Sequence, residues 1–135
     1  MKRIYTFGHE QVERNITVGD IIENKQKDKK MTQVTAANQE EAEIIVKQNI
    51  DMIITGSDWY EDVRKGAPNT FITAALFAGR FITNEEILRG AFEVMMAGAD
   101  SVLTPRSFEV VEMLAKEGMQ VCLLYTSDAA DEDLR

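Results

Sequence analysis

Short apolar segments with strand-forming side chains alternate with helical segments along most of this chain, and the connections between them are brief. Parallel strands need crossover connections, which are usually helices, so this alternation is typical of β-α-β units and a parallel sheet. An α/β fold is therefore expected. The predicted strands are 31–36, 51–55, 70–75, 101–104 and one that begins at 119, and the predicted helices are 21–27, 39–48, a short piece through 59–63, 84–96 and 108–116.

Three of the predicted helices are preceded by capping signals. Thr17 with Asp20, and Thr83 with Glu86, have the spacing of a capping box, in which each side chain bonds to the other residue's backbone amide. Ser107 precedes the last helix and is a candidate cap for it. These signals predict where the three helices begin.

A weak internal repeat relates residues 50–55 (IDMIIT) to 99–104 (ADSVLT). Both segments follow a predicted helix and have Asp in second place, three mostly apolar positions and a closing Thr. Repeated strand-helix units with nothing to close the sheet imply a barrel or a doubly wound sheet that continues. We favour the N-terminal part, about half, of a (β/α)8 TIM-type barrel, partly on a resemblance given below.

The C-terminal end departs from this pattern after Val121. Residues 122–132 (CLLYTSDAADE) back-translate, codon for codon, into the read-through of a common transposase-type sequencing adapter. Artefactual segments are excluded from fold reasoning, so 1–121 is assigned to the partial barrel domain and 122–135 to a non-native tail. The alternative is an ordinary acidic C-terminal tail. The single cysteine, Cys122, belongs to the tail, which leaves the native part without thiol chemistry.

Composition argues against two classes of partner. The formal net charge is −8, whereas nucleic-acid binding needs clustered Lys and Arg, and the basic cluster at 25–30 is interrupted by Gln26 and Asp28. No apolar run approaches the ~18 residues that span a bilayer. The N-terminus lacks the apolar core of a signal peptide. We expect a cytoplasmic protein that binds neither nucleic acid nor membrane.

Six segments occur in an order and spacing shared with one enzyme family. They are 17–25 (TVGDIIENK), similar to T-V-x-D-I-x-x-x-K; 33–36 (QVTA), similar to V-M-L-T-A-Y-D; 50–58 (IDMIITGSD), similar to G-V-D-x-I-L-V-G-D-S; 66–76 (GAPNTFITAAL), similar to G-A-P followed by V-V-A-D-L; 98–102 (GADSV), similar to G-A-D-A-V; and 117–121 (EGMQV), similar to A-G-I-P-V. On these segments, residues 16–121 resemble the ketopantoate hydroxymethyltransferase (3-methyl-2-oxobutanoate hydroxymethyltransferase) family, a relative of the phosphoenolpyruvate mutase and isocitrate lyase barrels.

The resemblance implies a barrel transferase of pantothenate biosynthesis. Such an enzyme moves a hydroxymethyl group from methylene-tetrahydrofolate to a branched 2-oxoacid. A divalent metal, Mg²⁺, held by carboxylates at strand ends would bind the 2-oxoacid and polarise its carbonyl group. We also expect the full-length protein to be a homo-oligomer.

This chain departs from the family where the chemistry lies. Ser57-Asp58 stands in place of Asp-Ser, and a one-residue shift along a strand would turn the carboxylate to the opposite face. Ala75 stands where the family has a second ligand Asp, and 103–107 (LTPRS) lacks the Lys and Glu of K-L-E-G-G. The family's general base is expected beyond 121. The alternative function is a non-catalytic homologue that lost the metal site and binds a small ligand or partner.

Polar residues at the C-terminal ends of the predicted strands are the candidate site residues, because barrel active sites lie at that end. Asp58 is the candidate metal ligand; otherwise it is a surface acid near a short helix. Arg106 and Ser107, at a helix start with free backbone amides, are candidates for binding a substrate carboxylate or phosphate. Ser57 is a third candidate for substrate binding. The simpler interpretation of Ser107 is plain capping.

Thr35 and Asn38 are further candidates for hydrogen bonds to substrate, although capping by Asn38 is the simpler interpretation. No catalytic residue is assigned. His9 is the only histidine, so neither a zinc cluster nor a Ser-His or Cys-His dyad can be built from this chain. We expect the chain alone to be inactive and to fold poorly, because a partial barrel leaves its first and last strands unpaired along one edge.

The adapter interpretation predicts that the native gene does not encode the residues after Val121. Resequencing the locus from independent genomic DNA should give a different continuation of the strand that begins at 119. Recovery of Tyr125-Thr126-Ser127-Asp128 from that DNA would show the tail to be native.

Overall fold

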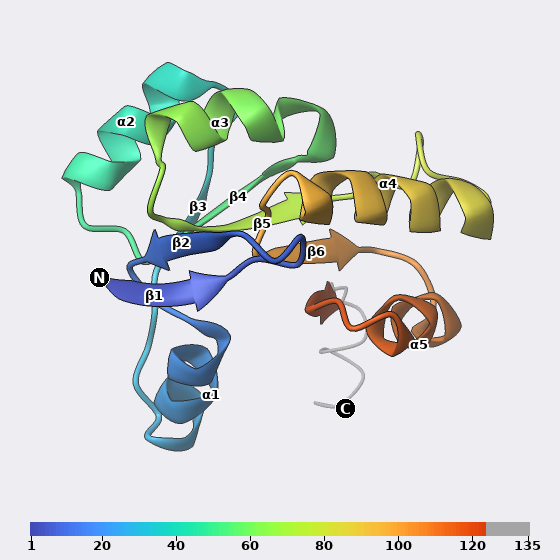
Figure 1. Ribbon diagram of the computed structural model, residues 1–135, viewed down its shortest axis with the longest axis horizontal. Coiled ribbons are helices and arrows are strands. Elements are labelled where there is room, and N and C mark those ends of the chain that lie inside the picture. Colours follow the sequence, from blue (N-terminus) through green and yellow to red (C-terminus); the bar gives the residue numbers. More distant parts are fainter. Residues whose placement is uncertain (124–135) are drawn as a thin grey trace, which may run out of the picture.

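The computed structural model describes residues 1–123 as an α/β structure with a five-stranded parallel sheet and a two-stranded antiparallel hairpin (Figure 1). The strand order of the larger sheet is β3-β4-β5-β6-β7, so each strand pairs with the next one along the chain. The strands are β1 (Lys2–Tyr5), β2 (Gln11–Arg14), β3 (Gln33–Thr35), β4 (Met52–Gly56), β5 (Phe71–Ala75), β6 (Ser101–Thr104) and β7 (Val121–Leu123). The helices are α1 (Val18–Gln26), α2 (Gln39–Lys47), the 3-10 helix η1 (Ser57–Trp59), α3 (Tyr60–Gly66), α4 (Asn84–Met96) and α5 (Phe108–Lys116).

The predicted α/β class and parallel sheet are confirmed, and each predicted strand and helix is present with ends shifted by a few residues. The hairpin of β1 and β2 was not predicted. Strand β7 includes Cys122 and Leu123, which the sequence analysis assigned to the tail, whereas the rest of the tail lies outside the described residues.

Both predicted capping boxes are present. Thr17 and Asp20 exchange side-chain and backbone hydrogen bonds at the start of α1, and Thr83 and Glu86 do the same at α4. The backbone amide of Thr83 donates to the Glu86 carboxylate and thereby lowers its pKa. The prediction for Ser107 is wrong in one respect. Ser107 stands at the N-cap of α5 with extended backbone angles, but its side chain makes no capping hydrogen bond.

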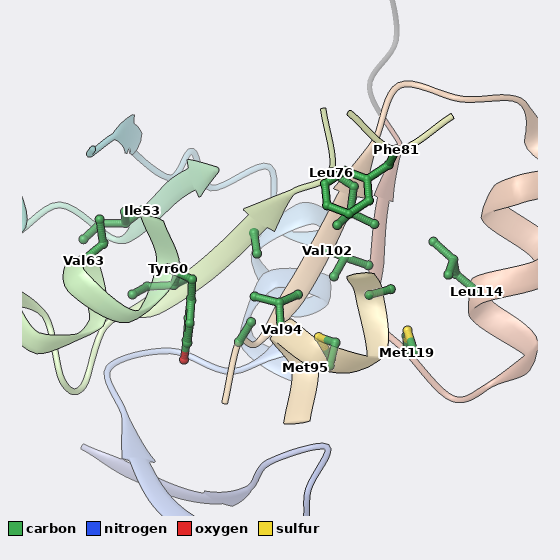
Figure 2. Packing of buried hydrophobic residues seen from close by; sticks show 14 of the residues in the cluster. Ile53, Tyr60, Val63, Leu76, Phe81, Val94, Met95, Val102, Leu114 and Met119 are labelled. Atoms are coloured by element: carbon green, nitrogen blue, oxygen red, sulfur yellow. The ribbon is translucent and has the colours of Figure 1, made fainter. Parts of the chain in front are cut away.

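The hydrophobic core lies between the larger sheet and its helices (Figure 2). Ile53 pairs in register with Ile72, and Val102 with Ala74, so these fully buried side chains lie on one face of the sheet. Burying each large aliphatic side chain contributes about 1.5–3 kcal/mol. The helices and loops cover this face with Tyr60, Val63, Leu76, Ile87, Val94, Met95 and Leu114.

Helices α2 and α3 pack closely at a glycine. A Cβ atom at Gly66 would lie 2.2 Å from the backbone oxygen of Gln39, a distance that no side chain tolerates. Asp62 of α3 also accepts a hydrogen bond from the Gln39 amide at 2.9 Å, which satisfies one free donor at the start of α2. Gly66 and Asp62 of α3 therefore fix where α2 lies on α3.

A buried carboxylate, Asp100, ties the hairpin to the N-terminal ends of the strands. The Nε atom of Arg14 donates to both of its oxygens, at 2.8 and 3.0 Å, and Nη2 of Arg64 donates at 2.9 Å. The backbone amide of Ile72 donates to the same carboxylate at 2.9 Å. The side chains of Arg14 and Asp100 are only 3% and 4% exposed, so water is largely excluded from this pair.

Asp51 makes the equivalent contact one repeat earlier. Its carboxylate accepts from the backbone amide of Thr32 at 2.9 Å, and Thr32 is the residue opposite it on the neighbouring chain segment, just before β3. Asp100 accepts in the same way from Ile72, its neighbour at the start of the β5-β6 pairing. The sequence repeat thus corresponds to a recurrent hydrogen bond that aligns the start of one strand with the strand before it.

We expect Asp100→Asn to destabilise the full-length protein by about 3 kcal/mol or more, because removing one member of a buried ion pair leaves uncompensated charge. The measurement is urea unfolding followed by circular dichroism. Glu112→Gln is the control, since its pair with Lys116 is solvent-exposed and is worth at most about 1 kcal/mol. Equal unfolding free energies for the two variants would contradict the role given to Asp100.

Candidate functional site

The C-terminal ends of β4, β5 and β6 meet at one edge of the sheet. Gly56 pairs in register with Ala75, and Ala75 with Leu103, so the three strands end at nearly the same level. The loop after β4 contains Ser57 and Asp58, and the loop after β6 contains Arg106 and Ser107. The four candidate residues therefore follow strands that end at a common edge.

Asp58 is bound to an arginine that the sequence analysis did not single out. Its Oδ2 atom lies 3.0 Å from Nε of Arg80, and the two side chains are 52% and 60% exposed. Arg80 belongs to the β5-α4 loop, so the ion pair joins that loop to the β4-α3 connection. A cavity of about 210 Å³ lies beside the pair, lined by Ser57, Asp58, Tyr60, Glu61, Arg80, Phe81, Gly90, Glu93, Val94 and Ala97.

An aromatic pair joins the same two loops. The rings of Trp59 and Phe77 are 6.0 Å apart between centroids and meet edge to face at 62°. Gly56 makes room for them, because a Cβ atom there would lie 2.7 Å from the Phe77 ring. Trp59 is about half exposed and lies near the candidate residues, whereas Tyr60 is buried and burial raises the pKa of its hydroxyl.

Arg106 contacts backbone oxygens. Its Nη1 atom donates to the carbonyl groups of Phe81 at 3.2 Å and Ile82 at 2.6 Å, and its own amide donates to the Thr104 hydroxyl at 3.2 Å. The guanidinium thus fastens the β5-α4 loop to the loop after β6. Ser107 is exposed at the first turn of α5.

The described residues offer few ligands for a magnesium ion. Mg²⁺ prefers carboxylate oxygens in octahedral geometry. The Asp58 carboxylate already faces a guanidinium, and the side chain of Ala75, at the end of β5, supplies no oxygen. Within residues 1–123, no group of three or more His, Cys, Asp or Glu side chains is placed to hold a metal ion.

Asn38 serves as a helix cap, as its simpler interpretation predicted. Its Oδ1 atom accepts from the Glu41 amide at 2.9 Å at the start of α2. Thr35 is exposed on β3 and makes no hydrogen bond through its hydroxyl group among the described residues. Neither residue lines the cavity beside Asp58.

A larger cavity, of about 880 Å³, lies toward the opposite end of the sheet. Residues of the β1-β2 hairpin, the start of α1 and the end of α4 line it, together with Phe71 and Asp100. Of the residues discussed as candidates, only His9 contributes to its wall, from the hairpin turn, where its φ angle is 66°. This cavity is therefore separate from the C-terminal strand ends.

Comparison with models of known protein families and with curated protein sequences found no match to this chain. None of the helices within residues 1–123 is both long and apolar enough to cross a membrane.

Arg106 is predicted to hold the β5-α4 loop. In Arg106→Ala, we expect the amides of Arg80 and Phe81, which donate to the Phe77 carbonyl, to exchange about tenfold faster with deuterium, because the loop opens locally more often. Hydrogen exchange read by mass spectrometry or NMR measures this. Arg89→Ala, which removes an exposed arginine from α4, should leave these amides unchanged. Unchanged exchange in Arg106→Ala would rule out the fastening role.

Proposed function

We propose that the full-length protein is a β/α-barrel transferase that binds a small branched 2-oxoacid and transfers to it a hydroxymethyl group from methylene-tetrahydrofolate. The transfer itself rests on the resemblance to ketopantoate hydroxymethyltransferases. One observation supports binding of a 2-oxoacid. Strands β4, β5 and β6 end at the same level of the sheet, and polar residues lie in the loops that follow them. Barrel enzymes bind substrates at that end of their strands.

The strand order supports the barrel part of this proposal. Each strand of the larger sheet pairs with its successor, whereas doubly wound sheets reverse direction at a switch point. Strand β5 is buried along its whole length, as expected for a parallel strand covered on both faces. On the face opposite the helices, the hydroxyl groups of Thr73 and Ser101 lie 2.6 Å apart, and in the proposed barrel this face is the interior.

The described residues can bind and orient a 2-oxoacid. Ser57 presents a hydroxyl group beside the ion pair of Asp58 with Arg80. The first turn of α5, starting at Ser107, leaves backbone amides free to donate to an anion. Arg106 keeps the neighbouring loop in place. Because the described side chains offer few ligands for a magnesium ion, no step through a metal ion is assigned to them.

A second candidate function is ligand binding without turnover. It is favoured by Ala75 at the second ligand position and by the ion pair that occupies Asp58. A protein of this kind would retain the strand-end binding site and lack hydroxymethyl transfer. A protein can lose its metal-ligating residues and retain its fold, because the fold alone does not determine the function.

The test is calorimetric titration of the full-length protein with 3-methyl-2-oxobutanoate, together with an assay of hydroxymethyl transfer from methylene-tetrahydrofolate. We expect binding, and we expect Asp58→Asn and Arg106→Ala each to weaken it by about tenfold, because each residue holds a loop of the site in place. Lys116→Gln, an exposed residue at the C-terminal end of α5, away from the Ser107 end of that helix, is the control.

The outcomes separate the two functions. Binding with hydroxymethyl transfer supports the transferase, and binding without transfer supports the non-catalytic homologue. If the 2-oxoacid does not bind at all, or if neither Asp58→Asn nor Arg106→Ala changes its affinity, the site is wrongly assigned.

A further inference from the structure

Arg80 has unused donors beside the candidate site. Its Nε atom faces the Asp58 carboxylate at 3.0 Å, and no hydrogen-bond partner of its two Nη atoms is found within residues 1–123. Its guanidinium carbon lies 5.1 Å from the centre of the Phe81 ring, a distance at which cation and ring attract each other. The guanidinium thus contacts Asp58 and Phe81, and the side chain is otherwise largely exposed.

Three residues contact Arg80 or the loop that contains it. Arg106 binds the carbonyl groups of Phe81 and Ile82, which holds the loop on which Arg80 lies. Phe81 lies under the guanidinium, and Asp58 orients its Nε edge. A planar fork held in this way matches the two oxygens of a carboxylate, which arginine binds with two parallel hydrogen bonds.

We propose that Arg80 is the residue that binds the ligand's carboxylate, in a manner independent of metal, and that Asp58 and Arg106 are positioning residues for it. The inference rests on the proposed function and deepens it. It follows from the poor fit of the described residues to Mg²⁺: a guanidinium stands at Asp58, the residue predicted to hold the ion. Arg106 is less suited to the ligand, because its Nη1 atom is already bound to two carbonyl oxygens.

The charges around the cavity restrict the class of ligand. Glu61 and Glu93 line the same cavity as Arg80, and both are exposed. Together with Asp58 these acids make the described lining net negative around its one arginine, so each further negative charge on the ligand adds repulsion. Like charges in close proximity repel. The site therefore favours a monocarboxylic 2-oxoacid over a dicarboxylic one.

The experiment is calorimetric titration of the full-length protein with 3-methyl-2-oxobutanoate, once with EDTA and once with Mg²⁺. We expect equal affinity in the two conditions. Arg80→Ala should weaken binding by about tenfold or more, since hydrogen bonds between charged groups are lost. Arg80→Lys should restore part of the affinity, because it keeps the charge without the fork. Arg89→Ala is the matched control, an exposed arginine paired with Glu85, and should bind like the unaltered protein.

A selectivity measurement tests the role of the two acids. The unaltered protein should bind 3-methyl-2-oxobutanoate at least about tenfold more tightly than 2-oxoglutarate. In the double variant Glu61→Gln, Glu93→Gln the ratio of these two affinities should be smaller. Circular dichroism of every variant establishes that the fold is intact.

Each result has one meaning. Binding that requires Mg²⁺, or binding that Arg80→Ala leaves unchanged, overturns the inference and leaves the proposed function standing. An absence of binding by the unaltered protein in both conditions overturns the proposed function and the inference together. Metal-independent binding that depends on Arg80 and not on Arg89 supports both.

Discussion

The carboxylate of Asp100 is the interaction on which the arrangement of the strands depends most. It accepts from two arginines of distant segments, Arg14 of the hairpin and Arg64 of α3, and from the Ile72 amide of β5. Arg14 and Arg64 also donate to carbonyl oxygens in the turn before β5, those of Pro68 and of Thr70. With little water present, each partner is costly to remove, so the hairpin, the turn and two strands are held together at one end.

The register of the strands of the larger sheet also determines where their C-terminal ends lie. Asp51 sets the start of β4 against β3, and Asp100 sets the start of β6 against β5. The register of β4, β5 and β6 brings their C-terminal ends to the same level. The loops that follow can then meet. They do so through two neighbouring contacts, the ion pair of Asp58 with Arg80 and the aromatic pair of Trp59 with Phe77. The end of the sheet where the strands begin carries the buried ion network, and the end where they finish carries the exposed groups available to a ligand.

The structural features that could be predicted from the sequence are those that depend on residues close together in the chain. The capping boxes at Thr17 and Thr83 and the bounds of α5 were predictable because the interacting residues are at most a turn apart. The hairpin was missed because its strands are short and mostly exposed, and so lack apolar alternation. The repeat pointed to Asp100, but its partner Arg14 lies 86 residues away and no local pattern joins them. Arg80 lies in an irregular loop, and only the fold brings it to Asp58.

The central proposal is that the two Nη atoms of Arg80 bind the ligand's carboxylate. The most direct measurement is a crystal structure of the full-length protein with 3-methyl-2-oxobutanoate, grown in the presence of Mg²⁺. The account predicts the ligand's carboxylate within hydrogen-bond distance, about 2.7–2.9 Å, of the two Nη atoms of Arg80, with Asp58 still on Nε. A metal ion bound to Asp58, with the 2-oxoacid on that ion and Arg80 turned away, would contradict it.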